Sequence, residues 1–142
     1  MARTIYLAVF TNGQRAAHWA IWIPTTGQEV VGKMLHVSGS PATGFFLEFK
    51  RNYDFRSTNR RYQVLPLAQV HDQYVVDTPG DTLITETTAR DRVESTATVV
   101  PPPGRAANPF DPMIVAFVER LIADGYVTVD ARVVLQNAPR VL

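Results

Sequence analysis

Residues 16–24 read AAHWAIWIP, and they predict a β-strand that begins at a histidine. Side chains alternate between the two faces of a strand. One face therefore carries His18, Ala20 and Trp22, and the other carries Trp19, Ile21 and Ile23. Pro24 and the turn residues TTGQ end the strand. This strand, with its histidine at the first position, is the starting point for both the fold and the chemistry.

Four further stretches have the β-branched and aromatic composition of strands. They are TIYLAVFT (4–11), VVGKMLHVSG (30–39), GFFLEFKRNY (44–53) and RYQVLPLAQV (61–70). Short turn sequences separate them, including Asn12-Gly13, which predicts an antiparallel meander. Pro66 predicts that the last strand lies at an edge or contains a bulge, since proline cannot donate to a ladder.

The composition changes after Val76. Residues 77–108 are polar, rich in threonine and include the run Pro101–Pro103. We expect an irregular excursion here, with at most a short strand over 96–100. A loop of this length is typical of a lid, a wrapped segment or a mobile surface loop.

A helix follows in DPMIVAFVERLIADGY, with Asp111 as its N-cap and Pro112 at its first position. Apolar residues recur at helical spacing, and Gly125 is the expected stop. A shorter helix is expected after Asp130, with residues 133–135 facing inward. The sequence thus predicts one domain over 1–142 with an α+β fold: an antiparallel sheet of about five strands and one or two C-terminal helices.

Composition limits the functional classes. The chain has 142 residues, a formal charge of +1 and no cysteine. The absence of cysteine excludes disulfides, thiolate metal sites and a cysteine nucleophile. The low net charge does not favour nucleic acid as a partner. The apolar run near the start, IYLAVF, is too short for a signal-peptide core or a membrane span, so we expect a cytoplasmic protein without membrane contact.

His18 and His36 lie on neighbouring predicted strands. If the register agrees, the two rings meet, and one imidazole could act as a base while the other orients it. Trp19 or Trp22 could wall an apolar substrate, and Asp111 could supply an acid. The alternative is that both histidines are packing residues and that Asp111 only caps its helix.

The segments HWAIWI and MLHVSG resemble the paired histidine strands of permuted papain-like thiol enzymes, which include the lecithin:retinol acyltransferase-like and cell-wall-peptidase-like groups. In those enzymes a strand motif His-Trp-Ala-Leu-Tyr-Val carries the base, and the nucleophile follows later in an Asn-Cys pair that opens a helix. The segments RTIYLAVF and LEFKRNYD and the Asp-Gly end of the helix are also similar to small, mostly uncharacterised fungal proteins.

The resemblance implies a papain-like fold, with His18 as the base and His36 as the second histidine. The nucleophile is missing, because Pro109 follows Asn108 at the corresponding place. Two functions stay open. One is a cofactor-free small-molecule enzyme (isomerase, cyclase or lyase type) that uses a histidine base for proton transfer. The other is a non-catalytic pseudo-enzyme that binds a ligand or another protein.

Charge is unevenly distributed along the middle of the chain. KRNYDFRSTNRR (50–61) has five basic residues against one acid, whereas 71–94 has six acids against two arginines. The two stretches could neutralise one another, or the first could form a solvated hairpin loop or a patch for carboxylate or phosphate. Arg51 and Tyr53 are the candidate substrate-binding residues of this stretch.

The sequence predicts neither a metal site nor a cofactor. The three histidines, at 18, 36 and 71, are widely spaced and lack a carboxylate cluster beside them. The expected partner is a small molecule, and pairing of two chains through an edge strand into a homodimer is an open alternative.

Overall fold

The computed structural model describes residues 1–11, 17–40, 44–100 and 111–140. Its strands are β1 (Ala2–Phe10), β2 (His18–Pro24), β3 (Val31–Ser40), β4 (Gly44–Asp54), β5 (Tyr62–His71) and β6 (Ile84–Glu86). Its α-helices are α1 (Arg92–Thr98), α2 (Asp111–Ala123) and α3 (Ala131–Asn137), and two short 3-10 turns are η1 (Phe55–Ser57) and η2 (Asp72–Tyr74). The fold is α+β, with helices at the C-terminal end as predicted.

The strands form one antiparallel sheet in the order β5-β1-β2-β3-β4-β6. β1 to β4 are the predicted meander, β5 returns to pair with β1, and β6 adds a sixth strand beside β4. Pro66 lies on the edge strand β5, where the register with β1 shifts between Ile5 and Tyr6. The prediction of an edge or a bulge at this proline is therefore confirmed on both counts.

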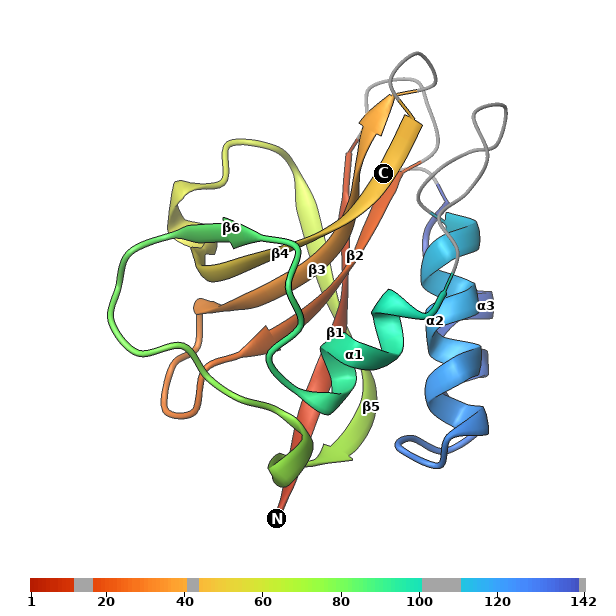
Figure 1. Cartoon of the computed structure of the whole chain (residues 1–142). Coiled ribbons are helices and arrows are strands. Elements are labelled where there is room, and N and C mark those ends of the chain that lie inside the picture. The colour runs from red at the N-terminus through yellow and green to blue at the C-terminus, as the bar shows by residue number, and fades with distance from the viewer. Residues whose placement is uncertain (12–16, 41–43, 101–110, 141–142) are drawn as a thin grey trace.

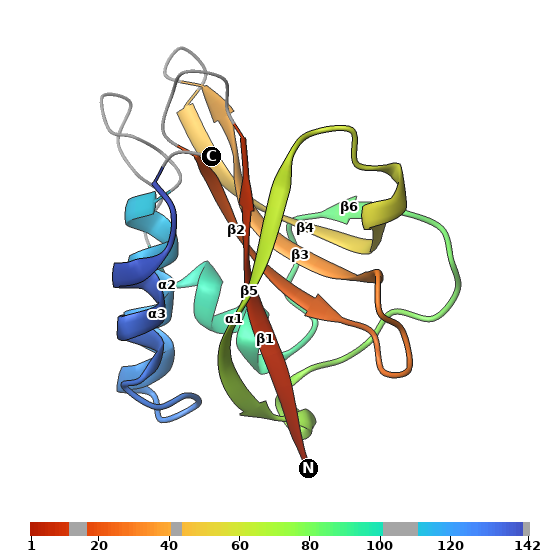
Figure 2. The same cartoon turned by 180° about the vertical axis from the view of Figure 1, so that it is seen from behind.

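One face of the sheet is covered by the helices. Figures 1 and 2 show α2 and α3 side by side along this face, and the apolar residues of α1 join the same core. Trp19, Ile21 and Ile23 of β2 lie in that core, with Leu35 of β3 and Phe117 of α2. The main core thus forms between the sheet and the three helices.

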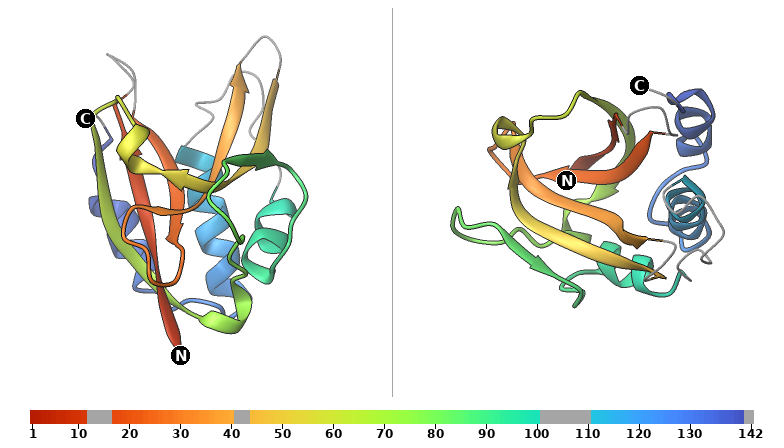
Figure 3. Two further views of the ribbon diagram at one scale, coloured as in Figure 1. Left: turned by 90° about the vertical axis from the view of Figure 1, so that its left-hand side faces the viewer. Right: turned by 90° about the horizontal axis from the view of Figure 1, so that it is seen from above.

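The opposite face has no α-helix on it within the described residues. A smaller cluster forms there from Ala8, Phe10, Ala20, Trp22, Met34 and Phe55. Phe55 comes from η1, which lies on the side of the sheet away from α2 and α3 (Figure 3). This aromatic-rich face is also the one to which His18 belongs, because His18 alternates with Ala20 and Trp22 along β2.

A bulge in β4 decides which face its last residues occupy. Phe49 and Arg51 lie on the helix side, but the register with β3 shifts between Gly32 and Met34, and Asn52 has a φ of 58°. One extra residue moves every later side chain to the other face. Tyr53 consequently lies beside Trp22 on the aromatic face rather than against the helices.

The prediction of an irregular segment over 77–108 was wrong in part over 77–100, and residues 101–108 lie outside the described residues. A strand over 96–100 does not form, since 92–98 is the helix α1, and the strand β6 was not predicted. Asp91 caps α1 by accepting a hydrogen bond from the Glu94 N–H, and Val93 and Ala97 are buried against the core. The threonine- and valine-rich composition favours a strand, but capping and tertiary burial outweigh propensity.

The ends of α2 and α3 follow the sequence only in part. The N–H groups of Gly125 and Tyr126 bond to Ile122 and Leu121, so Gly125, with a φ of 80°, is the predicted stop in a Schellman motif. The shorter helix α3 begins after Asp130 as expected, and Asp130 is its N-cap residue, although the Asp130 side chain makes no cap hydrogen bond. Of the residues expected to face inward, Leu135 is buried but Val133 is exposed.

None of the helices in the described part of the chain is long and apolar enough to cross a membrane.

Candidate functional site: the aromatic face of the sheet

The two histidines meet on the aromatic face. His18 pairs with Phe10 of β1, and His36 pairs with Glu48 of β4. The ring centroids of His18 and His36 are 5.5 Å apart, and both side chains are nearly inaccessible, with exposed fractions of 9% and 6%. The neighbouring strands therefore bring together the two rings that the sequence singled out.

Glu48 is the third member of this group. Its Oε1 lies 2.9 Å from His36 Nε2, and its side chain is largely buried. His36 Nδ1 is buried without a hydrogen-bond partner among the described residues. Sequence reasoning missed Glu48, although a single acid within the apolar strand GFFLEF was a usable signal, because an unpaired carboxylate is costly to bury.

Burial favours the neutral form of both imidazoles. It lowers the pKa of His18 to about 3, with smaller contributions from the charges of His36, Arg60 and Lys50. Burial and then Lys50 also lower the pKa of His36, against the opposing effect of Glu48. A base works best when its pKa is near the working pH, so His18 in this state is a weak proton acceptor.

A cavity of about 370 Å³ opens on the same face, towards the end of β2 that is opposite His18. It is lined by Tyr6, Trp22, Pro24, Gln28, Glu29, Val30, Phe55, Tyr62 and Val64. Phe55 contacts two of the other lining rings: its ring stacks on Tyr62 at 4.6 Å and meets Trp22 edge-on at 4.6 Å. Such aromatic contacts stabilise the arrangement of these three side chains.

The cavity has few polar groups, and several of them are available to form hydrogen bonds with a ligand. The hydroxyls of Tyr6 and Tyr62 have no hydrogen-bond partner in the described ranges, and the exposed side chains of Gln28 and Glu29 stand at the rim. An apolar space with a small number of such groups is the usual form of a small-molecule site.

Phe10 separates the histidines from this cavity. Its ring is 5.9 Å from His18 and 6.0 Å from Phe55, and Arg60 lies over it at 4.7 Å. Neither histidine belongs to the lining. A molecule in the cavity would therefore touch Trp22 and Phe55 but not the imidazoles.

Of the residues predicted to bind substrate, Trp22 lines the cavity and Tyr53 lies one layer behind it. Tyr53 packs against Phe55 at 5.3 Å, and its hydroxyl bonds to that of Thr58. Trp19 does not wall this site, because alternation places it on the helix side. There its Nε1 donates to the Pro139 carbonyl at 3.0 Å.

Arg51 is fully buried on the helix side and does not reach the cavity. It donates to both oxygens of Glu94, at 2.6 and 2.8 Å, and to Glu86 at 2.5 Å. Lys33 binds the same Glu94 and also Asp91. Of the alternatives for the charged stretches 50–61 and 71–94, mutual neutralisation holds at Arg51, whose charge is consequently not available to an anion in solution.

Asp111 is the first residue of α2, but its side chain lies outside the described residues, so its predicted roles as acid and as N-cap stay predictions. α2 packs through Phe117 and Leu121 on the face that carries Trp19, opposite the histidines. Three or more potential metal ligands do not gather anywhere in the described residues.

Comparison with known proteins places the chain in a family. A model for a family of unknown function, DUF6540, matches residues 5–128. The match includes both histidines, Glu48 and the whole lining of the cavity, and it ends before α3. Searches of curated proteins and of solved structures found no match.

Proposed function

The chain belongs to DUF6540, and we propose that it is a ligand-binding protein that holds a small, ring-containing organic molecule in the cavity beside Trp22. The observation that carries this proposal is the cavity itself, about 370 Å³ in volume and walled by four aromatic side chains. Volumes of about 300–1,000 Å³ are typical of small-molecule sites.

The chemistry of the wall defines the class of ligand. Trp22, Phe55 and Tyr62 offer ring faces and edges to a flat apolar body. Glu29 at the rim accepts hydrogen bonds only, so a hydroxyl or amine on the ligand would point there. The proposed ligand is therefore an aromatic or polycyclic molecule with one donor group at its edge.

Calorimetric titration with 1-naphthol tests this function. We expect saturable binding to the wild-type protein and at least about tenfold weaker binding to Val64→Trp, whose indole ring would occupy part of the cavity. Val133→Trp is the matched control, because Val133 is 55% exposed on α3. Equal affinity for both variants, or no binding to the wild type at millimolar probe, would refute the proposal.

A second function, proton transfer with His18 as the base, is favoured by the arrangement of Glu48, His36 and His18. Glu48 would orient His36, and His36 would support the charge on His18. The small exposed fraction of His18 and its lowered pKa make this candidate the weaker one. Proton transfer by His18 would require the protein to open locally at Phe10, so that a substrate can reach the imidazole.

Acylation by diethyl pyrocarbonate, followed by mass spectrometry, measures that opening. His71 is exposed and provides the internal reference. If His18 is modified at a rate within about tenfold of that of His71, a substrate can reach the His18 imidazole, which would support this function. Protection of His18 by more than about a thousandfold, the ratio expected for a site open only through rare local unfolding, would exclude this function.

We keep the likeness to permuted papain-like enzymes as a proposal about descent. The meeting of two histidines from adjacent strands supports it. The catalytic arrangement does not follow, because a nucleophile at the start of a helix must lie within hydrogen-bond reach of its base. Here α2 packs on the other face of the sheet.

A further inference from the structure

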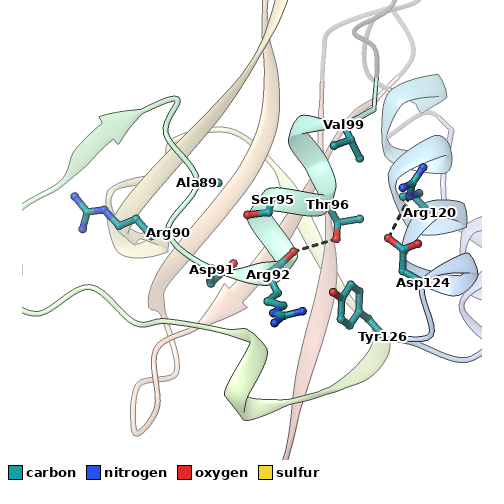
Figure 4. A pocket seen from close by; sticks show the side chains of 10 residues that line it. All are labelled: Ala89, Arg90, Asp91, Arg92, Ser95, Thr96, Val99, Arg120, Asp124 and Tyr126. Atoms are coloured by element: carbon teal, nitrogen blue, oxygen red, sulfur yellow. Dashed lines mark hydrogen bonds and ion pairs between the residues drawn. The ribbon is translucent and has the colours of Figure 1, made fainter.

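A second cavity, of about 550 Å³, lies between α1 and α2 (Figure 4). It is on the helix side of the sheet and shares no lining residue with the cavity at Trp22. Its wall includes three arginines, Arg90, Arg92 and Arg120, and two acids, Asp91 and Asp124. Which of these charges is free decides what the cavity can hold.

Both acids are already neutralised by the protein. Asp91 is bound to Lys33 and also accepts from the backbone N–H groups of Val76 and Glu94, at 2.9 and 2.8 Å. Asp124 binds Arg120 at 3.1 Å. Their carboxylates therefore present little negative charge to a molecule in the cavity.

Arg92 has no such partner. Six of the described arginines form ion pairs with carboxylates: Arg3, Arg51, Arg56, Arg90, Arg120 and Arg132. Arg92 is exposed and makes no ion pair or hydrogen bond through its side chain to any residue that the structure describes. In Figure 4, the Arg90 side chain points away from α2, whereas the Arg92 side chain extends on the side of Tyr126. Arg90 is paired with Glu86.

Two hydroxyl groups line the cavity together with the Arg92 guanidinium. Ser95 is one turn after Arg92 on α1, and Tyr126 follows α2 on the facing wall. The Tyr126 ring is held by an edge contact with Tyr74 at 4.8 Å, and its hydroxyl is unpartnered across the described residues. A guanidinium and two hydroxyls in one lining are donors of the kind that the several acceptor oxygens of a phosphate group require.

We propose that this cavity is a binding site for a small phosphate-bearing molecule, held by Arg92 with Ser95 and Tyr126. The guanidinium supplies a pair of parallel donors to two phosphate oxygens, and the hydroxyls reach the others. The volume beyond the phosphate leaves room for an organic group of about the size of a sugar. This site is independent of the function proposed for the aromatic face.

Titration with inorganic phosphate, followed by nitrogen–proton correlation spectra that include the arginine Nε–H signals, tests the site. We expect saturable shifts at Arg92, Ser95 and Tyr126, a loss of affinity of about tenfold or more in Arg92→Gln, and about threefold in Tyr126→Phe. Sodium chloride at matched ionic strength should not reproduce the shifts.

Arg61→Gln is the matched control, since Arg61 is another exposed arginine without an ion pair in the described part of the chain and is not in the lining. It should bind phosphate as the wild type does. The proposal is overturned if Arg92→Gln, shown to be folded by its spectrum, retains affinity within twofold, or if Arg61→Gln loses as much. Equal shifts with chloride would overturn it as well.

Discussion

Lowering the pH from 7 to 5 protonates His18 in the unfolded chain, where its pKa is 6.5, but not in the folded protein, where burial lowers the pKa to about 3. The unfolded state then binds more protons than the folded state, so the free energy of unfolding decreases. For a depressed pKa this contribution is fully present above the unfolded value and is lost as the pH falls through the window between 6.5 and 3.

The size of the effect follows from the two pKa values. At pH 5 the unfolded histidine is almost fully protonated and the folded one is not, which corresponds to about 1.5 pH units at 1.36 kcal/mol each. His18 alone should therefore cost the protein about 2 kcal/mol between pH 7 and pH 5. His36, whose pKa is also lowered, adds a loss of the same sign.

Urea unfolding at pH 7 and pH 5, monitored by tryptophan fluorescence, measures this loss. His18→Gln should reduce the pH dependence by about 2 kcal/mol whatever its own effect on stability, and His71→Gln, at an exposed position, is the control for the loss of an imidazole. The pH window avoids the carboxylates, which titrate lower. A wild-type change below about 0.5 kcal/mol, or an unchanged slope in His18→Gln, would refute the burial argument.

Three further substitutions test individual contacts by urea or thermal unfolding. Glu94→Gln should lower the free energy of unfolding by about 3 kcal/mol, since it leaves the buried guanidinium of Arg51 short of a charge partner; a loss under 1 kcal/mol would contradict this. Gly32→Ala should cost about 1–3 kcal/mol, because its Cβ would lie 2.3 Å from the Ile23 carbonyl oxygen, and an unchanged melting temperature would show that the strands can separate freely. Gly125→Ala should cost about 1 kcal/mol through its positive φ alone, as nothing lies within 4 Å of the added atom; a stabilised variant would count against the helix stop.

The strands and the longest helix were predictable because their signals are local. Alternation along 18–24 correctly separated Trp19 from Trp22, and the periodicity of 111–123 together with Gly125 located α2 and its end. The helix α1 was not predictable from local propensity. Its cap at Asp91 and the burial of Glu94 depend on Lys33 and Arg51, which are far away in the sequence.

The candidate site shows the same division. The sequence identified His18, His36 and Trp22, and the lack of cysteine excluded thiol chemistry on composition alone. The sequence did not show that Glu48 contacts His36, nor that Phe10 lies between the histidines and the cavity. Both arrangements depend on the register of the paired strands.

Composition excludes a thiol, and local periodicity predicts an α+β chain with one histidine on each of two neighbouring strands. The face of the sheet on which a side chain lies depends instead on how strands distant in sequence pair. The bulge at Asn52 moves Tyr53 to the aromatic side while Arg51 stays among buried acids. A single extra residue in a strand reverses every side chain after it, and its position is set by the partner strand rather than by the local sequence.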